Sequence, residues 1–144
     1  MFYISSEIER VTSYEKGMPN HKRKSLDETK WEPDPMIMDE RFLAVNVKDK
    51  GLVIFSACSH AGIVNVMKSA HKNLGEKIHA IVGGFHLSGA ANEVAIDATV
   101  EGFTEFSPDL IVPGHCTGWR AVQALVTQFG ARVVPMAVGM GLDM

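Results

Sequence analysis

The sequence has no long apolar run free of charge and no excess of positive charge. No stretch approaches the roughly 18 uncharged apolar residues that a membrane-spanning helix needs. The chain carries 14 lysines and arginines against 17 aspartates and glutamates. A net charge of −3 gives no electrostatic basis for nucleic-acid binding, which calls for a basic patch or stripe. We therefore expect neither a membrane nor a nucleic acid as a partner.

The N-terminal residues lack the charged and apolar regions of a secretory signal peptide. We therefore expect a cytoplasmic location. Cysteine is also scarce in this sequence. The two cysteines, Cys58 and Cys116, each lie within two positions of a histidine, namely His60 and His115. In a reducing compartment this proximity indicates a site rather than a structural disulfide. The alternative is that both are small buried thiols packed as hydrophobic side chains.

The composition is that of an ordinary folded domain. A length of 144 residues fits one domain, and a hydrophobic content of 46% with 22% charged residues is typical of globular proteins. Residues 13–40 are polar and contain Pro19, Pro33 and Pro35, which indicates a long loop with little regular structure. A loop of this length is typical of a lid, a binding loop or a disordered segment. We predict a loop-rich segment over residues 1–40 and a domain over residues 41–144.

From residue 41 onward, strand patterns alternate with helix patterns. Residues 41–47 alternate apolar with polar, and the apolar run that follows predicts a hairpin leading into a buried strand. The strands are predicted at residues 41–47, 52–55, 78–82, 108–112 and 133–136. The helices are predicted at residues 63–74, 92–106 and 122–129, the second of them capped by Asn92. The order ββαβαβαβ indicates an α/β fold in which helices cover a sheet.

Three histidines share one position in this pattern, because each follows a predicted strand and precedes a predicted helix. They are His60, His86 and His115. Open α/β sheets bind ligands at the carboxyl ends of their strands. Imidazoles on neighbouring strands, about 4.8 Å apart, can reach a common metal ion. One such histidine alone would more often be structural, but the repeated position favours a metal site.

Other chemistries have weaker support in the sequence. Ser59 lacks the flanking glycines of a nucleophile elbow. A thiolate of Cys58 or Cys116 beside a histidine is an alternative nucleophile, although adjacent residues at a strand end tend to point in opposite directions. We take His60, His86 and His115 as candidate metal ligands, and His86 and Cys58 as candidate catalytic residues.

Three linked motifs carry a family resemblance. They read GLVIFSACSHAGIVN at residues 51–65, GGFHL at residues 83–87 and PGHCTG at residues 113–118. In this order they closely resemble metallo-β-lactamase-superfamily hydrolases. Within the superfamily they look most like the subgroup of dihydropterin ribofuranosylaminobenzene phosphate synthase-like metal-dependent hydrolases.

The resemblance implies the C-terminal half of an αββα sandwich with a one- or two-metal site. The metal is usually zinc, with iron or manganese as alternatives, and it activates water to attack an ester, amide or phosphate-type bond of a small-molecule substrate. By this resemblance His115 matches the last metal-ligand histidine of the superfamily. His60 lies at or beside the position of a bridging aspartate, and His86 is a ligand or faces the substrate.

One superfamily motif is missing from this sequence. Members begin with another half that carries a His-x-His-x-Asp-His string, and no such string occurs here. We therefore expect an incomplete metal site and an uncovered apolar sheet face, as in a truncated chain, a split-gene product or a homodimer. The leading hypothesis is a metal-dependent hydrolase that needs the other half. The alternative is a non-catalytic half-domain that assembles with itself or with a complementary N-terminal half.

Overall fold

A five-stranded mixed sheet forms the body of the protein in a computed structural model that describes residues 1–143. The strands are β1 (Phe2–Ile4), β4 (Phe42–Val47), β5 (Gly51–Ser56), β6 (Ile78–Gly83) and β7 (Leu110–Pro113). They lie side by side in this order. β4 pairs antiparallel with β1 and β5, whereas β5, β6 and β7 run parallel. The carboxyl ends of the three parallel strands therefore share one edge.

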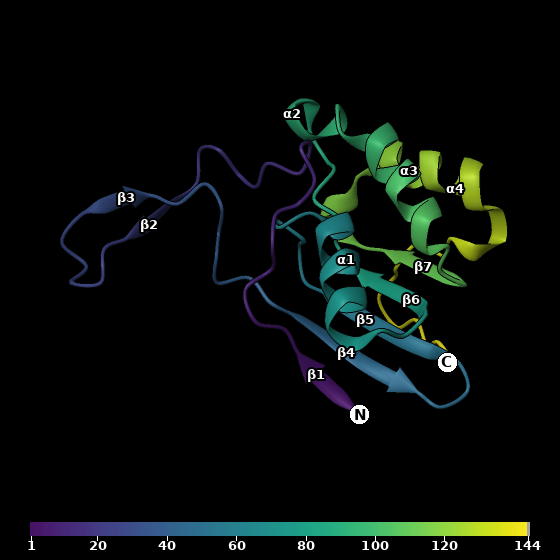
Figure 1. The fold of residues 1–144 in the computed structure, drawn as a ribbon. Coiled ribbons are helices and arrows are strands. Elements are labelled where there is room, and N and C mark those ends of the chain that lie inside the picture. The colour runs from purple at the N-terminus through teal and green to yellow at the C-terminus, as the bar shows by residue number, and fades with distance from the viewer. Residues whose placement is uncertain (144) are drawn as a thin grey trace.

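The helices pack on one face of this sheet (Figure 1). They are α1 (Ile63–Leu74), α2 (Ala90–Glu93), α3 (Ile96–Phe106) and α4 (Trp119–Phe129), with short 3-10 turns at His115–Thr117 and Gly130–Arg132. The core lies between sheet and helices. Its aromatic centre is Phe103 of α3, which is fully buried, with its ring centroid 5.5 Å from that of Phe85 and 6.1 Å from that of Phe129.

Helix α1 shows how the sequence fixes an element at both ends. Its apolar positions recur with helical spacing, and Gly75 ends it in the left-handed conformation at φ 68°, where its N–H donates to the carbonyl of His71. The N-terminus of α1 is capped by a residue that is distant in the sequence. The carboxylate of Glu15 accepts hydrogen bonds from the backbone N–H groups of Val64 and Asn65, at 2.8 and 2.9 Å. This satisfies two donors that the helix itself cannot pair.

The opposite face of the sheet is partly covered by the C-terminal residues. Val53, Val82 and Val112 form a second buried cluster there, and Leu142 packs against it. A cleft of about 600 Å³ separates parts of this face from Met136, Ala137 and Met140. The apolar face that we expected to be uncovered is therefore open only in places, such as Phe55, which is 39% exposed.

The α/β class and the half-sandwich architecture are confirmed, and two local predictions need correction. Residues 13–40, which we predicted to have little regular structure, include a short hairpin of β2 (Lys22–Lys24) and β3 (Trp31–Pro33) that projects from the body (Figure 1). Residues 133–136 make a single bridge, from Val133 to Ile111, rather than a strand. Val134 and Met136 donate to the carbonyls of Ile111 and Pro113, at 2.9 and 3.0 Å, but Pro113 has no N–H to donate back and complete a second bridge.

The second correction concerns Asn92, which does not cap the second long helix. Asn92 lies inside the separate short helix α2, and its side-chain amide donates to the carbonyl of Ser88 at 3.0 Å. Helix α3 starts after Ala95, without a side-chain cap. As for membranes, no helix within residues 1–143 has the length and apolar character to cross a bilayer.

Candidate metal centre

The three predicted histidines lie at the shared edge of the parallel strands. His60 follows β5, His86 follows β6 and His115 follows β7. The structure nevertheless divides them into two groups. Within residues 1–143, no tight cluster of ligand atoms joins His60 and His86 to His115. Which of the three bind a metal stays a prediction.

His115 belongs to a cluster with both cysteines. The ligand atoms of Cys58, His115 and Cys116 all lie within 4.8 Å of one another. The Sγ atom of Cys58 is 2.9 Å from Nε2 of His115. Zn–S and Zn–N bonds are about 2.3 and 2.1 Å long, so three donors this close can share one ion. Two thiols and an imidazole are also a donor set that suits zinc, so the residues present fit a metal.

Gly84 makes room for this cluster. A Cβ at Gly84 would lie 2.5 Å from Sγ of Cys116 and 2.7 Å from Cε1 of His115, both closer than van der Waals contact allows. The Sγ atom of Cys116 also accepts a hydrogen bond from the backbone N–H of His86, at 3.3 Å. Burial raises the pKa of the Cys116 thiol to about 11. Without a metal, this thiol therefore keeps its proton at neutral pH.

His60 and His86 form a second group beside the cluster. Their ring centroids are 4.6 Å apart, with the rings at 72°. The pKa of His86 is lowered chiefly because burial disfavours the charged imidazolium, and secondarily by the neighbouring His60; Glu40 opposes this shift. The backbone of His86 has φ 50°, a left-handed conformation that is uncommon for a residue with a side chain.

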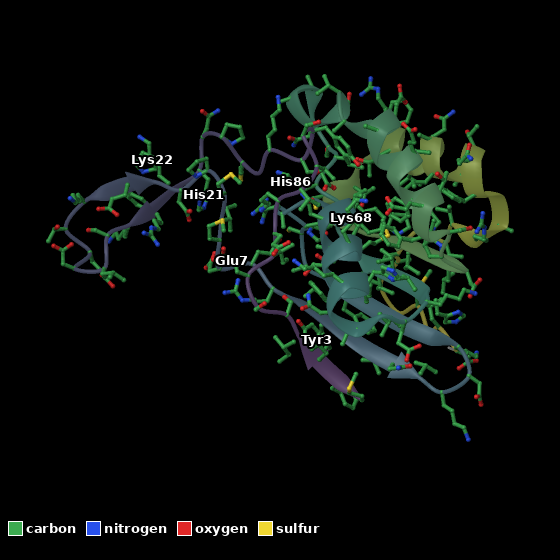
Figure 2. All side chains as sticks on the ribbon, in the orientation of Figure 1. Tyr3, Glu7, His21, Lys22, Lys68 and His86 are labelled. Carbon is green, nitrogen blue, oxygen red and sulfur yellow. The ribbon has the colours of Figure 1, made fainter. Side chains whose placement is uncertain are left out.

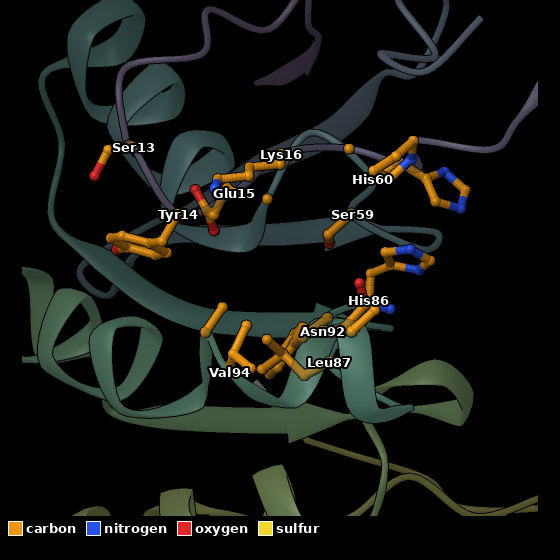
Figure 3. A pocket seen from close by; sticks show the side chains of 16 residues that line it. Ser13, Tyr14, Glu15, Lys16, Ser59, His60, His86, Leu87, Asn92 and Val94 are labelled. Atoms are coloured by element: carbon orange, nitrogen blue, oxygen red, sulfur yellow. The ribbon is translucent and has the colours of Figure 1, made fainter. Parts of the chain in front are cut away.

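A cleft of about 310 Å³ opens next to these two histidines. Figure 3 shows His60 and His86 at one end of it, with Tyr14 and Val94 toward the other. One wall comes from residues 13–17 of the N-terminal segment, and the other from the loop and short helix around Asn92. The N-terminal segment thus contributes a wall of the candidate site.

Sequence reasoning missed two residues of this region and undervalued a third. Glu40 was not considered, yet its carboxylate accepts the backbone N–H groups of His60 and Ala61 at 2.9 and 2.6 Å. Glu15 was also missed. The position of Cys116 next to His115 indicated a site, but Cys116 was taken as an alternative nucleophile and not as a candidate metal ligand. Neither glutamate belongs to a motif, so the sequence held no comparable signal for them.

The remaining histidines lie outside the site, as their positions in the sequence indicated. His79 has Nδ1 2.8 Å from Oδ2 of Asp109, and His71 is exposed on α1. His21 lies on the arm that carries β2 and β3, away from His86 (Figure 2). Its Nδ1 is 3.0 Å from the carbonyl oxygen of Asp34.

Fold and site together define an α/β protein whose fold resembles half of a metallo-β-lactamase sandwich, with a Cys/His cluster at its sheet edge that could hold a metal ion. No protein-family model matches the chain. The structure is similar to that of a metal-dependent hydrolase of the β-lactamase superfamily, with a TM-score of 0.84 and 28% identity over 99% of this chain. The predicted resemblance to the superfamily is therefore confirmed.

Two proteins of Methanocaldococcus jannaschii are similar in sequence. One is 7,8-dihydropterin-6-methyl-4-(β-D-ribofuranosyl)-aminobenzene-5′-phosphate synthase, 42% identical over 94 residues, or 65% of this chain. The other is an uncharacterized protein, 39% identical over 90 residues, or 62% of this chain. The chain spans 31% of the length of each of these relatives and 53% of the structural neighbour.

Proposed function

We propose that this chain carries the metal-binding edge of a metal-dependent hydrolase that acts on a small molecule. The observation that carries the proposal is the cluster of Cys58, His115 and Cys116, whose ligand atoms lie within 4.8 Å of one another. Its place at the carboxyl ends of parallel strands is where α/β sheets bind ligands. The similarity to a protein described as a metal-dependent hydrolase supports the reaction class.

Zinc is the metal that we propose. Thiolate ligands select zinc over manganese, and a catalytic zinc site with two cysteines and one histidine is chemically well suited to leave a position open for water. Iron is the first alternative, since imidazole also binds it. We propose that any further ligands come from a complementary half, because the chain covers 53% of the structural neighbour.

In such a site, different residues of this chain would bind the metal and exchange protons with the substrate. A bound metal ion supplies Lewis acidity and lowers the pKa of water at the site. Cys58, Cys116 and His115 would hold the ion. His86, whose pKa is lowered by burial, is neutral at physiological pH and can exchange a proton with a group in the cleft. The cleft of about 310 Å³ excludes bulk water from one side of the substrate and limits its size.

Metal content and hydrolysis together test this proposal. The purified full chain is expected to hold about one metal ion. Any hydrolysis of three probes, p-nitrophenyl acetate, bis(p-nitrophenyl) phosphate and an amino-acid p-nitroanilide, is expected to depend on that ion. Both properties are expected to fall on changing His115→Ala and to persist in His71→Ala, which alters an exposed histidine of α1. Folded wild-type protein without metal contradicts the proposal, as does hydrolysis that survives His115→Ala.

We also propose a cytoplasmic location. Its support is the chemistry of the site, because two thiols must stay reduced to serve as metal ligands, and a reducing compartment keeps them so. Secretion into an oxidising medium would put Cys58 and Cys116, which are both free, at risk of pairing with each other.

A non-catalytic role in assembly is the second candidate. It is favoured by the partly open apolar face, where Phe55 is 39% and Met136 is 45% exposed. The occupant that we propose is a second copy of this chain or a complementary half with its own sheet. Light scattering of the wild type and of Phe55→Lys tests it: a dimer that dissociates in the variant supports assembly, and a wild-type monomer at high concentration counts against self-assembly.

A further inference from the structure

We propose that Glu40 is a positioning residue that holds the ring of His60 in one tautomer, with Nδ1 protonated and Nε2 unprotonated. The consequence for chemistry rests on the proposed function, since an unprotonated Nε2 can then serve a metal ion or a substrate proton. Glu40 itself contacts neither of these. It acts on the site through His60.

The contacts of Glu40 converge on the His60 loop. One carboxylate oxygen, Oε1, accepts the backbone N–H of His60 at 2.9 Å and lies 3.2 Å from Nδ1 of the same residue. The other oxygen, Oε2, accepts the N–H of Ala61 at 2.6 Å. The backbone and the ring of His60 thus face one carboxylate.

Burial strengthens the electrostatic interaction between Glu40 and His60. The Glu40 side chain is 7% exposed and that of His60 is 23% exposed. Water screens such a pair poorly, so the orientation of a single proton matters more than it would at the surface. If Nδ1 carried its lone pair toward Oε1, two electron-rich atoms would face each other at 3.2 Å. A proton on Nδ1 turns this repulsion into attraction.

Arg10 also forms hydrogen bonds with the His60 loop and with the segment that precedes Glu40. Its Nη1 donates to the carbonyl oxygen of His60 at 2.7 Å, and its Nη2 donates to the carbonyl oxygen of Met36. Met36 lies four residues before Glu40 in the chain. Arg10 therefore ties the segment that carries Glu40 to the loop that carries His60.

The tautomer decides what His60 can do. A neutral imidazole has one N–H donor and one acceptor nitrogen, so a carboxylate oxygen that faces one nitrogen favours the tautomer with the proton there. Carboxylates set metal-binding histidines in this way, and their loss typically costs 10- to 100-fold in metal affinity or activity. The ring of His60 packs edge-on against His86, at a centroid distance of 4.6 Å, at the end of the cleft.

Nitrogen NMR tests the inference without using activity. Two-bond 1H–15N correlation spectra of the chelator-treated full chain, at about pH 8, show which ring nitrogen of each neutral imidazole is protonated, since the ordinary histidine pKa is about 6.5. The His60→Gln spectrum assigns the His60 signals. We expect Nδ1–H in the wild type and in Glu9→Gln, which alters an exposed carboxylate paired with Lys72. In Glu40→Gln we expect a shift toward Nε2–H.

The wild-type spectrum decides the matter even if Glu40→Gln fails to fold. A wild-type His60 that carries its proton on Nε2 overturns the proposal, as does an unchanged Nδ1–H in folded Glu40→Gln. If the chain binds metal, the Glu40→Gln substitution is also expected to lower metal affinity or kcat/KM by about 10- to 100-fold. If the chain neither binds metal nor hydrolyses any probe, the proposed function fails, while the spectra still establish the role of Glu40.

Discussion

Sγ of Cys58 lies 2.9 Å from Nε2 of His115, although 57 positions separate the two residues in the chain. They follow β5 and β7, which are not neighbours, because β6 runs between them. The contact passes over Gly84, the residue directly after β6. A glycine there lets the loops of the two flanking strands meet above the central one.

Gly84→Ala is expected to disrupt the candidate metal centre. The added methyl would lie 2.5 Å from Sγ of Cys116 and 2.7 Å from Cε1 of His115, so both ligands must move. We expect metal affinity, measured by competition with a chelator, to fall by about tenfold or more. Gly141→Ala is the control, because no atom lies within 4 Å of its added Cβ. Equal affinities in the two variants would contradict the site.

Cobalt substitution is expected to reveal thiolate ligation. Co²⁺ in the wild type should give the intense near-ultraviolet charge-transfer absorption of a metal–thiolate bond, because Cys58 and Cys116 both present sulfur to the cluster. Cys58→Ser and Cys116→Ser should each reduce that band by roughly half if both thiolates bind. A band that neither substitution alters would exclude both cysteines as ligands.

Phe103→Ala is expected to cost about 3–5 kcal/mol of the free energy of unfolding. Phe103 is fully buried and contacts the rings of Phe85 and Phe129, so its loss leaves a cavity in the core. Chemical denaturation measures the change. Val94→Ala, at a position that is 84% exposed, should change it by less than about 0.5 kcal/mol. A small effect of Phe103→Ala would show that the core can collapse around the gap.

Glu15 is expected to make stability depend on pH. Burial raises its pKa above the ordinary value of 4.5, despite hydrogen bonds from Val64, Thr12 and Asn65 that oppose the shift. A carboxyl with a raised folded-state pKa contributes stability below its unfolded pKa and loses it as the pH rises through the folded value. The free energy of unfolding of the wild type, relative to Glu15→Gln, should therefore fall as the pH rises from about 4.5.

Urea titrations of both proteins at a series of pH values measure this difference. Subtracting the two curves removes every other titrating group that they share. The constant loss of an acceptor in Glu15→Gln shifts the whole difference but not its slope. A difference that grows with pH would mean that the hydrogen bonds outweigh burial, so that the folded pKa of Glu15 is lowered.

Apolar spacing and capping residues in the sequence predicted the elements that are stabilised mainly by interactions between neighbouring residues. Helix α1 was predicted over the residues where it forms, because its apolar spacing and Gly75 act within the helix itself. The end of the chain was harder to predict. Residues 133–136 have the apolar character of a strand, but only tertiary pairing with β7 decides whether a ladder forms. Pro113 of β7 lacks the N–H that a second bridge would need.

In the N-terminal segment, the sequence did not predict the hairpin or the long-range contacts of two glutamates. The hairpin of β2 and β3 lies in a polar, proline-containing stretch whose composition favours a loop. Glu15 and Glu40, in the same segment, look like ordinary surface carboxylates in the sequence. Each instead reaches the backbone of a distant loop or helix. Such contacts depend on the path of the chain in space, and nothing in the neighbouring residues encodes that path.

The sequence by itself determined the α/β class, the family resemblance and the placement of three histidines after three parallel strands. These follow from short-range periodicity and from motifs that lie within single loops. Only the tertiary structure decided that His115 joins Cys58 and Cys116 while His60 faces His86 and Glu40. The reason is physical: a metal site needs donor atoms within a few ångströms, and side-chain direction at a strand end is set by packing against other loops rather than by position in the chain.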